Sequence, residues 1–401
     1  MLTGKQIAVV VTGGIAAYKV PGLVRSLIKA GASVRVALTP AAERFVTAET
    51  LEVLTKYPVL REGAAYPDSV GHIALADWAD LSVVVPATAN SLGKVAQGLA
   101  DNEALSSLLA NQGSIVFVPA MNHKMWANPA VQRNVARLRA DGHYVLEPGF
   151  GFLAEGYEGK GRMPEIEEIH AGIEAFFACQ NLDQPLDLTG QRLVISAGGT
   201  EEPIDPVRYL SNRSSGKMGT ALAHVALLAG AQVTLVQTPS AQNLPVLPGI
   251  TTRQVTTAQE LYTAMHEEIQ SADILVMAAA VSDYRAAQAA DQKIKKQDQD
   301  QGLRLELAEN PDILASLPKD KAYVIGFAAE TQRVVDYARQ KLEKKGAQMI
   351  VANDVSQAGI GFASEDNAVQ IVTPTDVLAV AKQSKYGIAA HILAQALKER
   401  E

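Results

Sequence analysis

The second half of this chain is organised around the stretch Gly198-Gly-Thr-Glu-Glu-Pro-Ile-Asp-Pro-Val-Arg-Tyr-Leu-Ser-Asn-Arg-Ser-Ser-Gly-Lys-Met-Gly219. It follows the apolar run Leu193–Ala197 and precedes a helical pattern at Thr220–Ala229. A segment so rich in Gly, Pro, Ser, Asn and Arg cannot bury a face. It must therefore cross the carboxyl edge of a sheet, where ligands bind in α/β domains.

Charged and hydrogen-bonding groups in this stretch predict an anion site. Arg208, Arg213 and Lys217 supply cations, and Ser214–Gly216 supplies free N–H groups at the start of a helix. A solvated loop is the alternative, but loops longer than about 12–15 residues in compact domains are usually functional.

The first half repeats the same order of strand, glycine turn, helix and strand. Ile7–Val11 runs into Thr12-Gly-Gly14 and then a helix, and Ser33–Thr39 is the next strand. In the second half Leu193–Ala197 and Gln232–Val236 hold the equivalent positions. This pattern predicts an α/β protein with two doubly wound, Rossmann-like domains and mainly parallel sheets.

Turn residues without periodicity at Cys179–Asp187 separate the two halves. The predicted domains are residues 1–180 and 188–401. A chain of 401 residues suits two to three domains at about 150 residues each.

Composition excludes several classes of protein. A net charge of −7 argues against a nucleic-acid-binding surface. The single cysteine, Cys179, excludes an intramolecular disulfide and a cysteine-based zinc cluster. No long apolar run or leader is evident, so we expect no membrane association and a cytoplasmic location.

The turns also argue against a dinucleotide cofactor. Neither contains G-x-G-x-x-G, and the second strands end in Thr39-Pro40 and Gln237-Thr-Pro239, without the acidic residue that an adenosine ribose requires. Thr12–Gly14 and Thr39 instead suit the phosphate of a mononucleotide.

Three further segments of the first half resemble the flavin-dependent cysteine decarboxylases. They are a His-Ile-x-Leu sequence at His72, Pro-Ala-Thr-Ala-Asn at Pro86, and Pro-x-Met-Asn-x-x-Met-Trp at Pro119. The resemblance implies FMN, which oxidises 4′-phosphopantothenoylcysteine to a thioaldehyde that loses CO2 readily. It implies that His72 is the acid/base and that Asn122 binds the substrate carboxylate. The implied cofactor-binding residues are Gly13, Gly14, Thr39, Pro86, Thr88 and Asn90.

The sequence departs from this family in the substrate flap. The family has Leu-Ala-Cys-Gly, whereas Leu153-Ala-Glu-Gly156 stands here before Gly159–Met163. Glu155 is predicted to replace the cysteine as proton donor if desolvation raises its pKa. The alternatives are release of an enethiol, or a proton from water or His72; Cys179 is too far along the chain to substitute.

The second half resembles phosphopantothenate–cysteine ligase. The resemblance rests on the Gly198–Gly219 stretch and on these motifs: Ala278–Asp283, Lys293–Lys296, Asn310–Ile313, Gly326–Thr331 and Ala352–Val355. It implies that CTP activates 4′-phosphopantothenate as an acyl-cytidylate and that the amine of cysteine displaces CMP.

The ligase resemblance also implies residue roles. Asn212 holds the intermediate, and Lys293 is carried over it by a mobile loop. Mg2+ is expected on the triphosphate, although no protein ligands are evident. The implied nucleotide-binding residues are Met277, Ala278, Ala279, Asp283, Lys293, Pro311, Asp312, Ile313, Leu314, Phe327, Lys341 and Lys345.

Decarboxylase followed by ligase is similar to the order in bifunctional proteins of coenzyme A biosynthesis. This resemblance implies a homo-oligomer, a dodecamer in which trimeric flavodomains are joined by dimeric ligase domains. Two alternatives remain, a flavin-binding regulatory protein and an active ligase whose flavodomain is a scaffold. The presence together of Lys293, Asn212 and Asp283 argues against the regulator.

Overall fold

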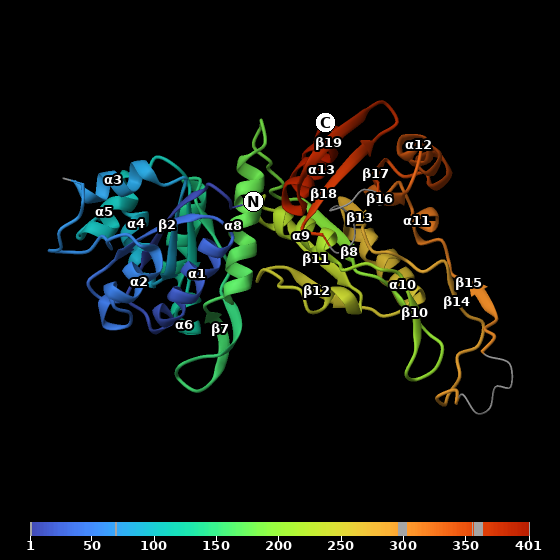
Figure 1. The fold of residues 1–401 in the computed structure, drawn as a ribbon, viewed down its shortest axis with the longest axis horizontal. Coiled ribbons are helices and arrows are strands. Elements are labelled where there is room, and N and C mark those ends of the chain that lie inside the picture. Colours follow the sequence, from blue (N-terminus) through green and yellow to red (C-terminus); the bar gives the residue numbers. More distant parts are fainter. Residues whose placement is uncertain (1, 69, 296–302, 355, 357–363, 401) are drawn as a thin grey trace. The chain divides into compact units, whose positions relative to one another are not determined.

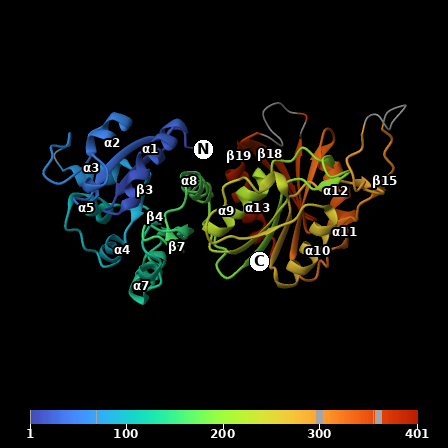
Figure 2. The ribbon, with the colours of Figure 1, turned by 90° about the horizontal axis from the view of Figure 1, so that it is seen from below.

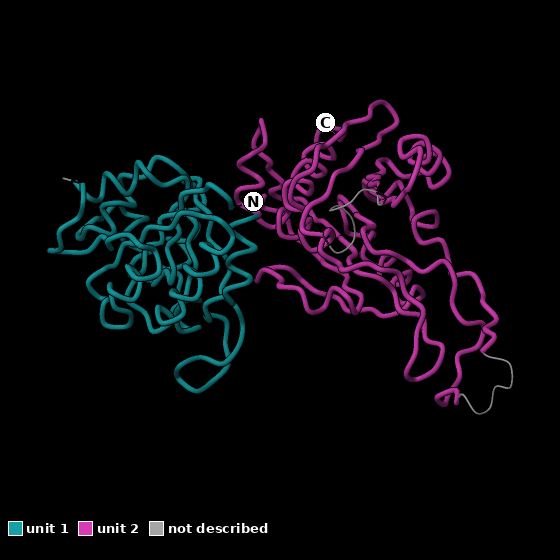
Figure 3. The backbone as a smooth tube through the Cα atoms, viewed as in Figure 1, with its two compact units in different colours: residues 1–174 teal, residues 175–401 magenta. Residues whose placement is uncertain are grey.

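The computed structural model describes residues 2–68, 70–295, 303–354, 356 and 364–400. The chain divides into two compact units, residues 1–174 and 175–401 (Figure 3). Each unit has a central sheet with strands that are mainly parallel (Figure 1), which confirms the predicted α/β class. No helix of the described part of the chain is long and apolar enough to cross a membrane.

The first unit is built on a parallel sheet with the strand order β2-β1-β3-β4-β5. Its strands are β1 (Gln6–Val11), β2 (Ser33–Leu38), β3 (Leu81–Ala87), β4 (Ile115–Pro119) and β5 (Tyr144–Val145). The chain proceeds outward from β1 in both directions, first to β2 and later to β3. The carboxyl ends of β1 and β3 therefore flank a topological switch point, the usual ligand site of such sheets.

Helices and one hairpin surround this sheet. The larger helices are α1 (Val20–Lys29), α2 (Ala48–Thr55), α3 (Gly71–Trp78), α4 (Ala89–Ala96), α5 (Glu103–Ala110), α7 (Pro129–Ala140) and α8 (Ile166–Gln180). Short turns of helix occur at η1 (Ile15–Lys19), η2 (Ala42–Arg44) and α6 (His123–Trp126). The hairpin, which we call the flap, consists of β6 (Gly149–Phe152) and β7 (Glu158–Arg162).

Apolar strands and local caps explain these elements. Every residue of β3 is buried, as expected for a central parallel strand covered on both faces. Thr88 and Asn102 accept hydrogen bonds from backbone N–H groups at the starts of α4 and α5.

The second unit contains an eight-stranded sheet with the order β12-β11-β8-β13-β16-β17-β18-β19. The parallel strands are β8 (Arg192–Ala197), β11 (Gln232–Gln237), β12 (Thr251–Gln254), β13 (Ile274–Met277), β16 (Tyr323–Glu330) and β17 (Met349–Asp354). β18 (Asp366–Val372) and β19 (Val377–Ser384) add an antiparallel edge. Two small ribbons are β9 (Glu201–Pro203) with β10 (Tyr209–Ser211), and β14 (Tyr284–Ala286) with β15 (Leu307–Glu309).

Helices of the second unit pack in two groups. α9 (Lys217–Leu228) and α13 (Lys385–Lys398) lie side by side (Figures 1 and 2). α10 (Ala258–Glu268), α11 (Ile313–Ser316) and α12 (Val334–Lys345) share a hydrophobic cluster with the sheet. The remaining helical turns are η3 (Pro239–Ala241) and η4 (Ile269–Ser271).

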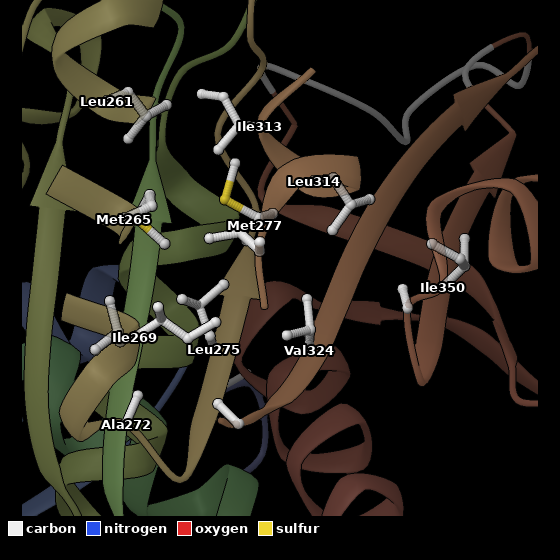
Figure 4. Packing of buried hydrophobic residues seen from close by; sticks show 14 of the residues in the cluster. Leu261, Met265, Ile269, Ala272, Leu275, Met277, Ile313, Leu314, Val324 and Ile350 are labelled. Atoms are coloured by element: carbon white, nitrogen blue, oxygen red, sulfur yellow. The ribbon is translucent and has the colours of Figure 1, made fainter. Parts of the chain in front are cut away.

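The hydrophobic cluster of the second unit lies under the carboxyl edge of its sheet. Figure 4 shows Met277 at the end of β13 close to Ile313 and Leu314 of α11. These three side chains are at most 9% exposed. Burying side chains of this size contributes about 1.5–3 kcal/mol each to the stability of the fold. The residues at this edge of the sheet are therefore fixed by the packing of the hydrophobic core.

Candidate functional site

The turn after β1 is tied to the end of β3 by Thr12. Its hydroxyl donates to the carbonyl oxygen of Pro86 at 2.6 Å, and the N–H of Thr88 donates to Thr12 Oγ1 at 3.2 Å. Gly13 lies against the next loop, because a Cβ at this position would stand 2.4 Å from Cβ of Ala41. The glycine is thus required by the close approach of the two loops.

Other predicted cofactor residues gather at the same edge. Thr39 is buried at the end of β2, and its hydroxyl donates to the carbonyl oxygen of Val11 at 3.3 Å. A Cβ on Gly14 would lie 3.4 Å from Cγ2 of Thr88, and Asn90 is exposed in the first turn of α4. Backbone N–H groups of a glycine turn and of a helix start fit a phosphate monoester, whereas the hydroxyls of Thr12 and Thr39 donate to carbonyl groups and hold the turn in shape.

His72 is placed in the first turn of α3 and has a carboxylate partner. Its Nδ1 lies 2.9 Å from Oε2 of Glu103 at the start of α5, and both side chains are about one-third exposed. A carboxylate on Nδ1 orients the ring and leaves Nε2 for another group. Within the part of the chain that the structure describes, His72 is hydrogen-bonded to Glu103 and to neither Asn122 nor Thr12. Glu103 was not predicted, since nothing in the sequence marks it except its place after the helix-capping Asn102.

Asn122 follows β4, and both the oxygen and the nitrogen of its side-chain amide form hydrogen bonds. Its Oδ1 accepts from the N–H of Lys124 at 2.9 Å, which begins α6. Its Nδ2 donates to the phenolic oxygen of Tyr157 in the flap at 2.5 Å. The Tyr157 ring also meets the His123 ring edge-on, with centroids 5.2 Å apart.

Glycines allow the flap to lie directly on the Asn122 loop. A Cβ on Gly161 would stand 2.1 Å from the carbonyl oxygen of Met121, and the Met121 N–H donates to the Gly161 carbonyl oxygen at 2.9 Å. A Cβ on Gly159 would stand 2.8 Å from Cβ of His123. The flap therefore contacts the predicted carboxylate-binding loop through its backbone.

Glu155 lies exposed at the tip of the flap. The Asn122 amide beside it is the main cause that lowers its pKa, and the charge of His123 adds to the effect. The raised pKa on which its predicted role as proton donor depends is therefore not found. Cys179 is a buried thiol whose pKa is raised to about 12 by burial.

The second unit has a cleft of about 920 Å³ at the carboxyl edge of its sheet. It brings together Asn212 and eleven of the twelve predicted nucleotide-binding residues. Those eleven are Met277, Ala278, Ala279, Asp283, Pro311, Asp312, Ile313, Leu314, Phe327, Lys341 and Lys345.

The floor of this cleft is apolar. Met277, Ile313 and Leu314 are members of the hydrophobic cluster in Figure 4. A Cβ on Gly326 would stand 2.6 Å from Cδ2 of Leu314, so a larger residue on β16 would require the Leu314 side chain to move. An apolar floor with a few polar groups is typical of a site for a flat ring.

One wall of the cleft is cationic. Lys341 Nζ donates to the carbonyl oxygen of Phe327 at 2.8 Å, and burial lowers its pKa. Lys345 forms an ion pair with Asp312, which also accepts from the N–H of Ala315 at 3.0 Å. Burial acts to raise the pKa of Asp312, but the hydrogen bonds from Lys345 and the Ala315 N–H, together with the charges of Lys345 and Lys341, outweigh it and the net shift is downward. Both ammonium groups are thus held in place before any ligand binds.

Loop-to-loop hydrogen bonds shape the opposite wall. Asn212 Nδ2 donates to the carbonyl oxygen of Val281 at 2.9 Å. The Asn310 N–H donates to the carbonyl oxygen of Asp283 at 2.8 Å, and Asn310 Nδ2 donates to that of Ser282 at 2.9 Å. The predicted intermediate-binding and nucleotide-binding loops are therefore connected.

The predicted anion loop is only partly in the cleft. Arg213 and Lys217 line it, whereas Arg208 does not. Arg208 is paired with the buried carboxylate of Asp205, whose pKa its hydrogen bonds lower. It also donates to the carbonyl oxygen of Ile294 at 2.7 Å. Arg208 thus holds the neighbouring loop in place, and its prediction as an anion ligand is not supported.

Lys293 is exposed beside Ile294 and is absent from the residues that line the cleft. Lys296 of the same motif and Val355 of the Ala352 motif lie outside the described residues.

Lys385 is a cleft residue that the sequence did not reveal. It is 5% exposed, donates from Nζ to the carbonyl oxygen of Ser364, and lies at the start of α13. Burial and then the charge of Lys217 lower its pKa to about 8. Its only sequence signal is the preceding helix cap, Ser384.

Comparison with known proteins covers both units. A flavoprotein family model matches residues 1–178, and the model of the DNA/pantothenate metabolism flavoprotein C-terminal domain matches residues 188–399. The chain is similar to the coenzyme A biosynthesis bifunctional protein CoaBC of Vibrio vulnificus strain YJ016, with 42% identity over 400 residues and 98% of each chain covered. It is 44% identical over 377 residues to the CoaBC protein of Escherichia coli K12, which covers 92% of this chain and 91% of that one.

The chain is also similar to solved structures, among them the C-terminal domain of a coenzyme A biosynthesis bifunctional protein CoaBC. That domain is 39% identical, covers 53% of this chain and 98% of its own, and has a TM-score of 0.44.

Proposed function

The chain belongs to the family of bifunctional coenzyme A biosynthesis proteins, with decarboxylase and ligase activities and a flavoprotein unit, and from that premise we propose how the two units work. The second unit joins cysteine to 4′-phosphopantothenate at the expense of CTP. The first unit removes CO2 from the resulting 4′-phosphopantothenoylcysteine to give 4′-phosphopantetheine.

The cleft of the second unit is the observation that carries the ligase proposal. Its apolar floor accepts the cytosine and ribose, and Lys341 and Lys345 supply charge for phosphate oxygens. Asn212 Nδ2 lies at the wall that would face the acyl group of the cytidylate. Lys293 enters the cleft from its exposed loop once substrate is bound, so that its positive charge reaches the reacting groups only in the reactive complex.

Magnesium is proposed to bind through the triphosphate. Among the described residues there is no group of three or more His, Cys, Asp or Glu side chains that could hold a metal ion. Mg2+ usually keeps several waters and uses substrate phosphates with one or two carboxylates. Asp283 is an exposed cleft carboxylate available for that role.

In the first unit, the turn Thr12–Gly14 with Thr39 and Thr88 is proposed to hold the phosphate of FMN. The isoalloxazine supplies oxidation of the cysteinyl thiol when bound. Asn122 presents a neutral amide to the substrate carboxylate, which binds it without the strong ion pair that would oppose loss of CO2. His72, oriented by Glu103, transfers the thiol proton.

Product analysis on the intact protein tests this function. Supplied with 4′-phosphopantothenate, cysteine and CTP, it is expected to release CMP and then CO2 in equal amounts. Absence of CMP, or release of CMP without CO2, would contradict the proposal. The cytoplasmic location and the dodecamer stay predictions, and the assembly is measurable as a solution mass.

A further inference from the structure

We infer that Tyr157 is the acid that protonates the substrate carbon after CO2 has left. This inference rests on the proposed decarboxylase function and names a group that the reaction needs. Loss of CO2 leaves an electron pair on the carbon that carried the carboxylate. That carbon must take a proton, and the neighbouring sulfur-bearing carbon must receive back the hydride that the flavin had taken.

The geometry around Asn122 places the phenol where the carboxylate departs. Asn122 Nδ2 donates to the Tyr157 oxygen at 2.5 Å while its Oδ1 is occupied by the Lys124 N–H at 2.9 Å. Since the phenolic oxygen accepts this bond, its own hydrogen is available to another acceptor. The second donor of Nδ2 interacts with Glu155 in the free protein, and a substrate carboxylate that displaced Glu155 would meet the phenol at the same amide.

The neighbours of Tyr157 keep it in this position. Its ring lies edge-on to His123 with centroids 5.2 Å apart, and 37% of the residue is exposed. Gly159 and Gly161 bring the flap backbone against the 121–123 loop, where any larger residue would collide. The phenol is thus anchored by packing against His123, and more than a third of the residue is exposed.

Glu155 is less suited to the same step. It is an exposed carboxylate whose pKa the Asn122 amide lowers, so it holds no proton to give at neutral pH. It also competes with the substrate carboxylate for the same N–H donor. Removing its charge should therefore tighten substrate binding without stopping protonation.

In this step, the Tyr157 O–H bond breaks as the new C–H bond forms, and solvent returns a proton to the phenolate. A flavin bound in the first unit would supply the hydride for the sulfur-bearing carbon. Without the proton, the substrate remains an enethiol and the flavin stays reduced.

Anaerobic single turnover of 4′-phosphopantothenoylcysteine by the flavin-loaded intact protein tests the assignment. The Tyr157→Phe protein should release CO2, yield a product two hydrogens lighter than the parent product, and keep its flavin reduced, as seen in the absorbance spectrum. The Glu155→Gln protein should give the saturated thiol with reoxidised flavin and a lower KM. Glu158→Gln, an exposed flap carboxylate, is the matched control and should behave as the parent.

Adding Glu155→Cys to Tyr157→Phe should restore saturated product, because it supplies a different acid in the same flap. Three results would overturn the inference: saturated thiol from Tyr157→Phe at the parent rate, enethiol from Glu155→Gln alone, or loss of CO2 release in Tyr157→Phe, which would make Tyr157 only a support for Asn122. Absence of CO2 from the unaltered protein would contradict the proposed function itself, and this inference with it.

Discussion

The cleft of the second unit and the flap of the first unit differ in how far their charged side chains are buried. In the cleft, Lys341, Lys345 and Lys385 are largely buried and each bonds to a carbonyl or carboxylate. In the flap, Glu155 is exposed. Preorganised buried cations suit a reaction on a triphosphate, in which charge must be neutralised. A reaction on a carbon atom needs a neutral acid instead, and the flap offers the Tyr157 phenol.

The largest expected effect is the loss of flavin and of decarboxylation in the first unit, with the ligase activity of the second unit unchanged. In the Gly13→Ala protein the new Cβ would meet Cβ of Ala41 at 2.4 Å, which displaces the turn proposed to hold the flavin phosphate. We expect colourless protein without CO2 release and with unchanged CMP release. Gly113→Ala, where the Cβ would be 3.4 Å from its nearest neighbour, should keep the flavin. A yellow Gly13→Ala protein would show that the phosphate binds elsewhere.

A second change asks whether the cleft is complete without its exposed loop. Lys293→Gln should slow amide formation about 100-fold, in the range for removal of one transition-state donor, and leave the Kd for CTP unchanged. Single-turnover CMP release and CTP titration measure the two quantities. Lys295→Gln, also exposed, is the control. An equal loss of CTP affinity would place Lys293 in the resting cleft.

Removing the half-buried Lys341 ammonium should weaken the binding of CTP. Lys341→Met deletes a charge-assisted bond of about 1.5–3 kcal/mol, which corresponds to a CTP Kd about 10- to 100-fold higher. Lys344→Met, on the exposed side of the same helix, should have no effect. Equal affinities for the two variants would remove Lys341 from the nucleotide site.

The smallest effect concerns pH. Because the pKa of Lys385 is lowered to about 8, its ammonium is present below that pH and lost above it. An anion in the cleft should therefore bind a few-fold more weakly at pH 9 than at pH 7, because most of the Lys385 ammonium has lost its charge at pH 9. Lys217, Glu365 and Asp366 face the same group. The Lys385→Met protein should lack this pH dependence, and its persistence there would assign the titration to another group.

The sequence was sufficient for the architecture because strand runs, glycine turns and helix patterns are local signals. It predicted the parallel strands β1 and β8 and their following turns, but not the antiparallel edge of β18 and β19. It also predicted eleven side chains that the cleft brings together. These were implied by the resemblance to the ligase family. Only some of them, such as Met277 at the end of β13, also follow from the rule that the carboxyl ends of parallel strands share an edge.

Hydrogen-bond partners that only the tertiary fold brings together could not be predicted from the sequence. Glu103 beside His72, Tyr157 on Asn122 and Lys385 in the cleft are separated from their partners by 21 residues or more. Arg208 was misread because a cation in a glycine-rich loop suggests an anionic ligand, whereas its anion is the buried Asp205.

Reciprocal inactivation tests the separation of the two chemistries most directly. The Gly13→Ala protein should convert 4′-phosphopantothenate, cysteine and CTP only to 4′-phosphopantothenoylcysteine. The Lys341→Met protein should decarboxylate added 4′-phosphopantothenoylcysteine at the parent rate while making little of it from CTP. A mixture of the two should complete the conversion to 4′-phosphopantetheine. If either single variant loses both activities, or if the mixture stalls at the ligase product, the two units do not act as separate catalysts.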